Sequence, residues 1–332
     1  MPNVTDMSNI QKKGIMVAGS ILVDKINEIS AYPKCGELTK IKNVSMSVGG
    51  CVPNVSICLK KICPTLLVFA AGKIGADQEG KFVIENLKQN GVDVSGVLGG
   101  NEKTTFTDVM SIPGGQRTFF TYLGADSSFS SADIDFSIKP PKMLHLGYFL
   151  LLDAVDNGQG LEILKKAKEN GIETSIDLVT ENSNRYELVV PCLEYVDYLI
   201  INETEAGKLS GIEPEYKNLR SIAEKLKQLG VRKKVIIHFP KGAVCLSDGE
   251  FCALGSYNLP KDYIKGTTGA GDAFCAGALI GIYDGKTDKE ILELASSCAV
   301  MALGESDSTS GLKSEQEIAK ICKKYERAKL CL

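Results

Sequence analysis

The sequence predicts an α/β protein with a mostly parallel central sheet, helices on both faces and a small β lid. Beyond Ala132, short apolar segments alternate with amphipathic segments that end at glycine, as in repeated βα units. Those apolar segments are near-continuous runs, which is typical of strands buried on both faces of a parallel sheet. Two stretches near 32–46 and 103–123 alternate between polar and apolar residues, and this predicts a small exposed sheet.

The composition is that of an ordinary globular protein. The 332 residues are 44% hydrophobic and 24% charged, and the net charge is −3. We expect residues 1–332 to form a single α/β domain into which the lid is inserted. The small net charge predicts no nucleic-acid partner, and no apolar run predicts a membrane-spanning helix.

Cysteine usage predicts a cytoplasmic protein. The chain has 11 Cys, an odd number, without a Cys-x-x-Cys pair, and several lie in apolar contexts. We therefore expect reduced core residues and no disulfide framework. Residues 1–13 are polar and lack the apolar core of a signal peptide. His145 and His238 lie inside apolar runs, so we expect buried histidines and no zinc site.

The first half of the chain predicts strands, helices and one hairpin. In order, we expect a strand at 14–20, an exposed ribbon at 32–46, a helix from 51 to 61 with Pro53 in its first turn, a strand at 66–72, a helix at 77–90 and a hairpin of 104–112 with 116–123.

The second half predicts the alternating βα units and ends in helices. In order, we expect strands at 143–146, 172–178, 195–201, 234–239 and 243–247, helices at 158–170 and 219–229 among them, and then helices after Asp272, at 289–303 and at 314–329.

The stretch Gly266-Thr267-Thr268-Gly269-Ala270-Gly271-Asp272 runs into an apolar helix rich in small residues. Gly269 and Gly271 let the backbone approach a ligand closely, and the first amides of a helix lack partners within it. With the positive end of the helix dipole they predict an anion site, most simply for a phosphate. Asp272 lies beside this site and can accept a proton from an attacking hydroxyl. The alternative is a turn in which Asp272 only caps the helix.

The run Thr267-Thr268-Gly269-Ala270-Gly271-Asp272-Ala273-Phe274 resembles the C-terminal signature of the ribokinase-like (pfkB) carbohydrate kinases. The resemblance extends over nearly the whole chain. It implies an ATP-dependent phosphotransferase with an alcohol group as acceptor. In such an enzyme Asp272 is the base, and Gly269, Ala270 and Gly271 stabilise the transferring phosphoryl group. It also implies Mg²⁺ as cofactor, a lid over the substrate and a homodimer formed through the lid.

The acceptor site is expected at the carboxyl ends of the strands. Asp24 follows the first strand, and its carboxylate can accept two sugar hydroxyls. Gly49, Gly50 and Asn54 match the N-terminal glycine motif of the family; the glycines let the backbone lie against a sugar, and the amide can donate and accept. Asp177 is the second expected carboxylate of this pocket. Turn, cap and strand-end roles are the alternatives for these residues.

The nucleotide site is implied mainly by the resemblance. Asn202 and Glu205 match the Asn-x-x-Glu motif of the family, in which the Glu helps to position Mg²⁺ and the Asn lies near the triphosphate. Lys241 and Gly242 form a turn that borders ATP in the family, and Thr268 is expected to contact ATP as well. A helix-capping arrangement at 202–205 and a plain hairpin turn at 241–242 are the alternatives.

Two positions depart from the family pattern. Gly266 stands where the family usually has an Asp that is associated with a monovalent-cation site, so the resemblance does not carry potassium activation over. Gly147 lies in the region where ribokinases have a sugar-binding Glu, which argues against ribose. Asp24 and Asp177 predict an acidic pocket for a neutral sugar or polyol, since it would repel a phosphorylated acceptor.

Three other functions are alternatives to a sugar kinase. A nucleoside kinase of the adenosine or inosine type would need a slot for its base, which aromatic residues of the lid could supply. A non-catalytic sugar or nucleotide sensor is disfavoured by the presence of Asp272 and Glu205. A dinucleotide-dependent oxidoreductase is disfavoured because no apolar strand leads directly into the glycine motif.

Overall fold

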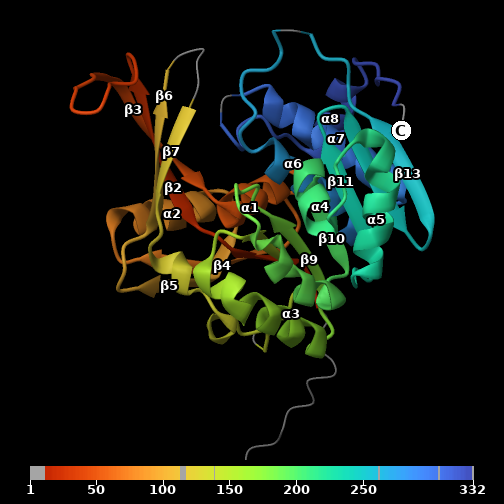
Figure 1. Cartoon of the computed structure of the whole chain (residues 1–332). Coiled ribbons are helices and arrows are strands. Elements are labelled where there is room, and N and C mark those ends of the chain that lie inside the picture. The colour runs from red at the N-terminus through yellow and green to blue at the C-terminus, as the bar shows by residue number, and fades with distance from the viewer. Residues whose placement is uncertain (1–11, 113–116, 138, 261, 306, 331–332) are drawn as a thin grey trace, which may run out of the picture.

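The computed structural model of the chain describes residues 12–112, 117–137, 139–260, 262–305 and 307–330. These residues form two sheets, a large one in the body of the molecule and a small one that projects from it (Figure 1).

The body sheet has nine strands, parallel from β5 to β11 and antiparallel at the β11–β12–β13 end. In spatial order they are β13 (Glu250–Gly255), β12 (Gly242–Ser247), β11 (Lys234–Phe239), β10 (Tyr198–Asn202), β9 (Glu173–Leu178), β8 (Met143–Phe149), β1 (Ile15–Gly19), β4 (Val68–Gly75) and β5 (Asp93–Gly100).

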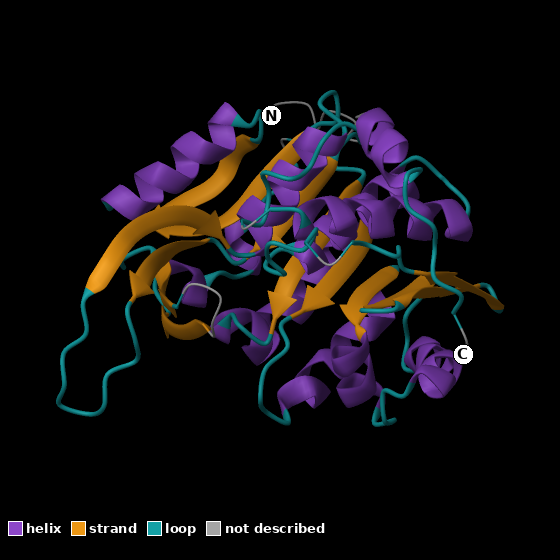
Figure 2. Ribbon diagram, turned by 90° about the horizontal axis from the view of Figure 1, so that it is seen from above, coloured by secondary structure: helices purple, strands orange, loops and turns teal. Residues whose placement is uncertain are grey.

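Helices cover both faces of the body sheet (Figure 2). One face packs against α1 (Cys51–Ile62), α6 (Ala270–Tyr283) and α7 (Asp288–Leu303), with α2 (Gln78–Gln89) and α8 (Glu315–Cys322) at its margins. The other packs against α3 (Gly160–Glu169), α4 (Glu203–Ser210) and α5 (Leu219–Gln228). Two hydrophobic cores result, one on each face. Of the described helices, none has the length and apolar character that crossing a bilayer requires.

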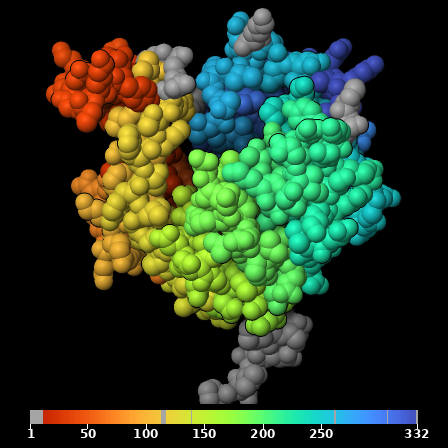
Figure 3. Space-filling view, viewed as in Figure 1, coloured from red at the N-terminus to blue at the C-terminus, as the bar shows by residue number. Residues whose placement is uncertain are grey.

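The small sheet, which we call the lid, has the strand order β3-β2-β6-β7. Its strands are β3 (Ile41–Gly49), β2 (Leu22–Ile29), β6 (Thr105–Ser111) and β7 (Arg117–Tyr122). The lid stands to one side of the body, and the surface is hollowed between it and the C-terminal half of the chain (Figure 3). This places the lid beside the loop that precedes α6.

The predicted fold class is confirmed, and most of the predicted elements are present within a few residues. Three strands were not predicted: β2, β5 and β13. The ribbon expected at 32–46 was partly wrong, because residues 31–40 are not strand and β2 supplies the partner of β3. The helix expected to Lys329 ends at Cys322, because the chain beyond it extends and pairs Arg327 with Tyr257.

Candidate active site

Two cavities meet at Asp272, beyond the carboxyl ends of the body strands. The first, of about 260 Å³, we call the strand-end cavity; it is lined by the ends of β8, β9 and β10 and by the start of α6. The second, of about 200 Å³, we call the lid cavity; it lies between the lid and the loop before α6. Tyr148, Gly269 and Asp272 line both, so a group transferred between the cavities would pass beside Asp272.

The start of α6 has the geometry of an anion site. Gly269 is the N-cap in the left-handed conformation, with φ of 77°, and a Cβ at this position would collide with Ser308. Only glycine meets both conditions without strain. No side chain of the described residues caps the helix, so its N-terminus is open to a ligand, although the Ala270 amide donates to the Thr267 carbonyl over 3.4 Å. Asp272 is the third helical residue, so the alternative in which it serves as the N-cap is wrong.

Asp272 is buried and bound by two donors. Asn54 Nδ2 donates to Asp272 Oδ2 over 2.9 Å, and the hydroxyl of Tyr148 lies 3.0 Å from both carboxylate oxygens. Burial raises the pKa of Asp272 to about 7, with a further rise from the charge of Asp177, while the bonds from Asn54 and Tyr148 oppose that rise. A carboxylate with a pKa near neutrality is well matched to general-base catalysis.

Asn54 has a second polar atom that stays unpaired. Its Oδ1 is buried and has no hydrogen-bond partner among the described residues, while its Nδ2 is engaged by Asp272. Since a buried acceptor without a partner is costly, this oxygen is suited to accept a hydroxyl from a ligand. Asn54 lines the lid cavity, so such a ligand would lie there, directly beside Asp272.

Asp24 belongs to the lid. The sequence suggested a position at the edge of the body sheet, but Asp24 lies within β2, where it pairs with Ser47 and points into the lid cavity. Gly49 permits this because a Cβ there would collide with the Asp24 carboxylate. Burial raises the pKa of Asp24 to about 6, and the charge of Arg117 opposes the rise. Arg117 lines the same cavity.

Tyr148 is a site residue that sequence reasoning missed. It lies near the end of β8 with a φ of 61°, which is rare for an aromatic residue, at a point where the β8–β9 register shifts. Its amide donates to Asp177 Oδ1 over 2.6 Å while its hydroxyl bonds Asp272. Backbone strain of this kind occurs where the surrounding structure holds a residue for function. The sequence carries no signal for it beyond its place after a buried strand.

The Asn202–Glu205 motif forms both a helix cap and one wall of the strand-end cavity. Asn202 Oδ1 accepts from the amide of Glu205 and Glu205 Oε2 accepts from that of Asn202, over 2.9 and 3.0 Å. Glu205 Oε1 also accepts from Thr180 at 2.6 Å. Burial raises the pKa of Glu205 to about 7. A buried carboxylate at a polar cavity fits Mg²⁺, which keeps several waters and needs one or two carboxylates.

The remaining predicted residues lie in different places. Asp177 lines the strand-end cavity, with its oxygens directed at the Tyr148 amide and at His145. Thr268 lines the lid cavity, where Arg117 donates to it over 2.9 Å. Lys241 and Gly242 line neither cavity; Lys241 lies over the ring of Tyr216, and Gly242 packs closely against β13.

Comparison with known proteins points to one family. The sequence profile described as pfkB family carbohydrate kinase matches residues 12–315. A ribokinase of Arabidopsis thaliana is 27% identical over 319 residues, which are 93% of this chain and 81% of the relative. The probable fructokinase-6, chloroplastic, of the same plant is 25% identical over 316 residues, which are 90% and 79% of the two chains.

Solved structures share the fold. The structure of Arabidopsis thaliana ribokinase complexed with ribose and ATP has a TM-score of 0.80 at 24% identity, and the alignment covers 94% of this chain and 99% of that one. The ribokinase of Thermotoga maritima gives 0.78 at 22% identity, with 94% and 99% covered. The arrangement of a parallel body sheet and a β lid is therefore common to these proteins and this chain.

Proposed function

The chain belongs to the pfkB family of carbohydrate kinases, and we propose that it transfers the γ-phosphoryl group of ATP to a hydroxymethyl group of a small sugar. One observation carries the proposal: Asn54 holds Asp272 with its amide nitrogen while its buried oxygen has no partner among the described residues. A sugar hydroxyl that donates to this oxygen would lie beside the base, at the junction of the two cavities.

In this proposal the lid cavity holds the acceptor. Asp24 and Asn54 bind its hydroxyls, and Gly50 begins the turn into α1 with a φ of 85°. Asp272, when ionised, accepts the proton of the hydroxymethyl group as that oxygen attacks the phosphorus. Tyr148 and Asn54 keep the carboxylate oriented. Much of the catalysis comes from holding these groups in line.

The strand-end cavity and the start of α6 hold the phosphates. The amides of residues 269–271 lie at the N-terminus of α6, where they would stabilise the charge that develops on the transferring group. Glu205, with Asn202, would hold hydrated Mg²⁺, which neutralises phosphate charge when bound. Thr268 and the turn at Lys241 and Gly242 remain predicted ATP contacts. A monovalent cation is not part of the proposal.

The size and charge of the lid cavity support a free monosaccharide or polyol as the acceptor. At about 200 Å³ it lies below the usual range of pockets for drug-sized ligands. Asp24 would repel a phosphorylated acceptor, although Arg117 offsets part of its charge. A nucleoside acceptor is not favoured, because the cavity would also have to hold the base.

We further propose that the chain forms a homodimer through the lid. A cytoplasmic location stays a prediction from cysteine usage.

A competition assay tests the substrate class. Coupled measurements of kcat/KM would compare ribose, fructose and related sugars with adenosine, inosine and fructose phosphates. We expect a free sugar to be preferred. If a nucleoside or a sugar phosphate won by ~100-fold, which is about 2.7 kcal/mol of transition-state binding, the assignment would be overturned.

A further inference from the structure

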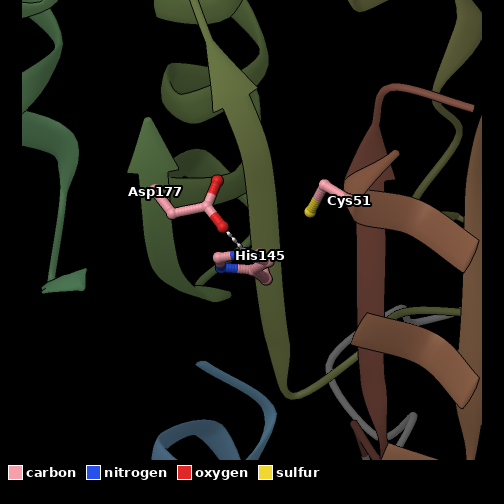
Figure 4. A group of neighbouring side chains, drawn as sticks. All are labelled: Cys51, His145 and Asp177. Carbon is pink, nitrogen blue, oxygen red and sulfur yellow. Dashed lines mark ion pairs between the residues drawn. The ribbon is translucent and has the colours of Figure 1, made fainter. Parts of the chain in front are cut away.

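A cluster of buried metal-binding side chains lies behind the strand-end cavity. Cys51, His145 and Asp177 each direct one ligand atom into the same space, and these atoms all lie within 4.8 Å of one another. They come from the first residue of α1 and from the neighbouring strands β8 and β9, and Figure 4 shows the thiol facing the carboxylate and the imidazole. Cys275 of α6 is not one of these three mutually close residues, but its Sγ lies 3.5 Å from His145 Nε2.

Two separations at His145 Nε2 match those of a tetrahedral metal site. With Zn–N and Zn–O near 2.1 Å and Zn–S near 2.3 Å, a tetrahedral centre sets N···O at about 3.4 Å and N···S at about 3.6 Å. In the structure, His145 Nε2 lies 3.4 Å from Asp177 Oδ2 and 3.5 Å from Cys275 Sγ. These two separations match the tetrahedral values, and the ligand atom of Cys51 lies within 4.8 Å of those of His145 and Asp177.

The neighbours of the cluster also suit a metal. His145 Nδ1 lies 3.1 Å from Ser175 Oγ, a partner that can hold the ring so that Nε2 faces the cluster. Asp177 Oδ1 accepts from the amide of Tyr148, which fixes the carboxylate. Gly147 keeps the space open, because a Cβ there would overlap the thiol of Cys51 and approach Asp177 Oδ1 to 3.0 Å.

We propose that Cys51, His145, Asp177 and Cys275 bind one thiophilic divalent cation, with Zn²⁺ as the best match. Two thiolates with an imidazole and a carboxylate favour Zn²⁺ over Mg²⁺, which prefers oxygen ligands and octahedral geometry. This site is separate from the Mg²⁺ expected at Glu205. It also stands independently of the proposed kinase reaction, because metal binding here needs no nucleotide or sugar.

The cation has a route into the cluster. Asp177 and Cys275 line the strand-end cavity, so an ion in that cavity meets two of the four ligands at its wall. The four ligands come from α1, β8, β9 and α6, which are far apart in the sequence. Metal binding would therefore link the start of α1 to α6, the helix that carries Asp272. It should stabilise the folded chain.

Cobalt binding tests the proposal directly. The full chain, without a polyhistidine tag and in a phosphine reductant with excess Mg²⁺, would be titrated with Co²⁺ and read by absorption spectroscopy. We expect one Co²⁺ per chain with a thiolate charge-transfer band and the intense visible bands of a tetrahedral site, displaced by one equivalent of Zn²⁺. A chain that binds no Co²⁺, or binds it without thiolate bands, would overturn the proposal.

Variants locate the site. Cys51→Ser and Cys275→Ser should each remove a thiolate from the spectrum and weaken binding at least ~10-fold, and Ser175→Ala should weaken it by about 10-fold through the ring of His145. Cys192→Ser is the matched control, because Cys192 is buried in the core on the opposite face of the sheet. Zn²⁺ should raise the Tm of the wild type and of this control equally, and that of the other three variants by less. An equal spectrum in the wild type and in Cys51→Ser would also overturn the proposal.

Discussion

The body and the lid bury their apolar side chains to very different extents. Every residue of β1 is buried, whereas every residue of β7 is exposed. The body sheet has helices on both faces, while the lid carries exposed apolar side chains such as Phe120 at 59% and Val44 at 67%. A sheet that leaves such side chains uncovered has a surface suited to another partner.

The candidate site draws residues from both the buried body and the exposed lid. The body contributes the start of α6, Asp272, which is held by a buried hydrogen bond from Asn54, and Glu205, which is held by Thr180. The lid contributes Asp24 from the partly buried strand β2 and Arg117 from the exposed strand β7. In the proposed mechanism the reaction chemistry thus lies on the buried body, and acceptor recognition lies partly on the exposed lid. The following predictions test that division, beginning with the largest effect.

Asp272→Asn should lower kcat by ~10²–10⁴-fold while ATP binding persists, since a positioned base contributes about that much. Steady-state kinetics and nucleotide titration would measure the two quantities. Asp153→Asn is the matched control, because Asp153 is exposed and lines neither cavity. Near-normal turnover in Asp272→Asn would show that the body does not supply the base.

The rate should depend on pH through Asp272. Its pKa is raised to about 7, so the carboxyl is protonated and inactive as a base at lower pH. We expect kcat/KM to fall about 10-fold for each pH unit below 7, which a pH profile at saturating Mg²⁺ would record. The groups around it are Asn54, Tyr148, Asp177 and Asp24. A profile that stays flat down to pH 5.5 would contradict a buried base.

The lid should mediate dimerisation. Phe119 lines the lid cavity, so alternation along β7 places Phe120 on the opposite, outer face. Phe120→Ser should raise the dimer dissociation constant by ~10-fold or more, because each buried Phe contributes about 1.5–3 kcal/mol. Light scattering would measure it. Phe119→Ser is the control, and it should alter the KM of the sugar while leaving the dimer intact. If the wild type is monomeric at micromolar concentration, the chain does not form a dimer through the lid.

Tyr148→Phe should have the smallest effect. Loss of its hydroxyl removes a bond that opposes the rise of the Asp272 pKa, so the acidic limb of the pH profile should move to higher pH. At pH 7 we expect kcat/KM to fall by about 3–10-fold, and to recover as the pH is raised. An unchanged limb with a lower rate at every pH would mean that Tyr148 only packs against the site.

The sequence predicted local features well and cross-chain contacts poorly. The loop Gly266–Asp272 and its helix were predicted because glycine spacing and small residues act within a short segment. The strand β2 was missed because Asp24, Lys25, Asn27 and Glu28 interrupt its alternation, and its pairing with β3 and β6 decides its conformation. The role of Tyr148 depends on a register shift between two strands.

By itself, the sequence determined the βα layout, and it predicted the anion site before α6 and Asp272 as the base, since these follow from periodicity and local backbone chemistry. The tertiary structure alone decided that Asn54, 218 residues away in sequence, holds Asp272. The tertiary structure also brought Cys51, His145, Asp177 and Cys275 close together. From the sequence we had expected no zinc site, because the two histidines lie inside apolar runs. The physical reason is that parallel strands bring distant residues to one edge, and sequence spacing does not encode that distance.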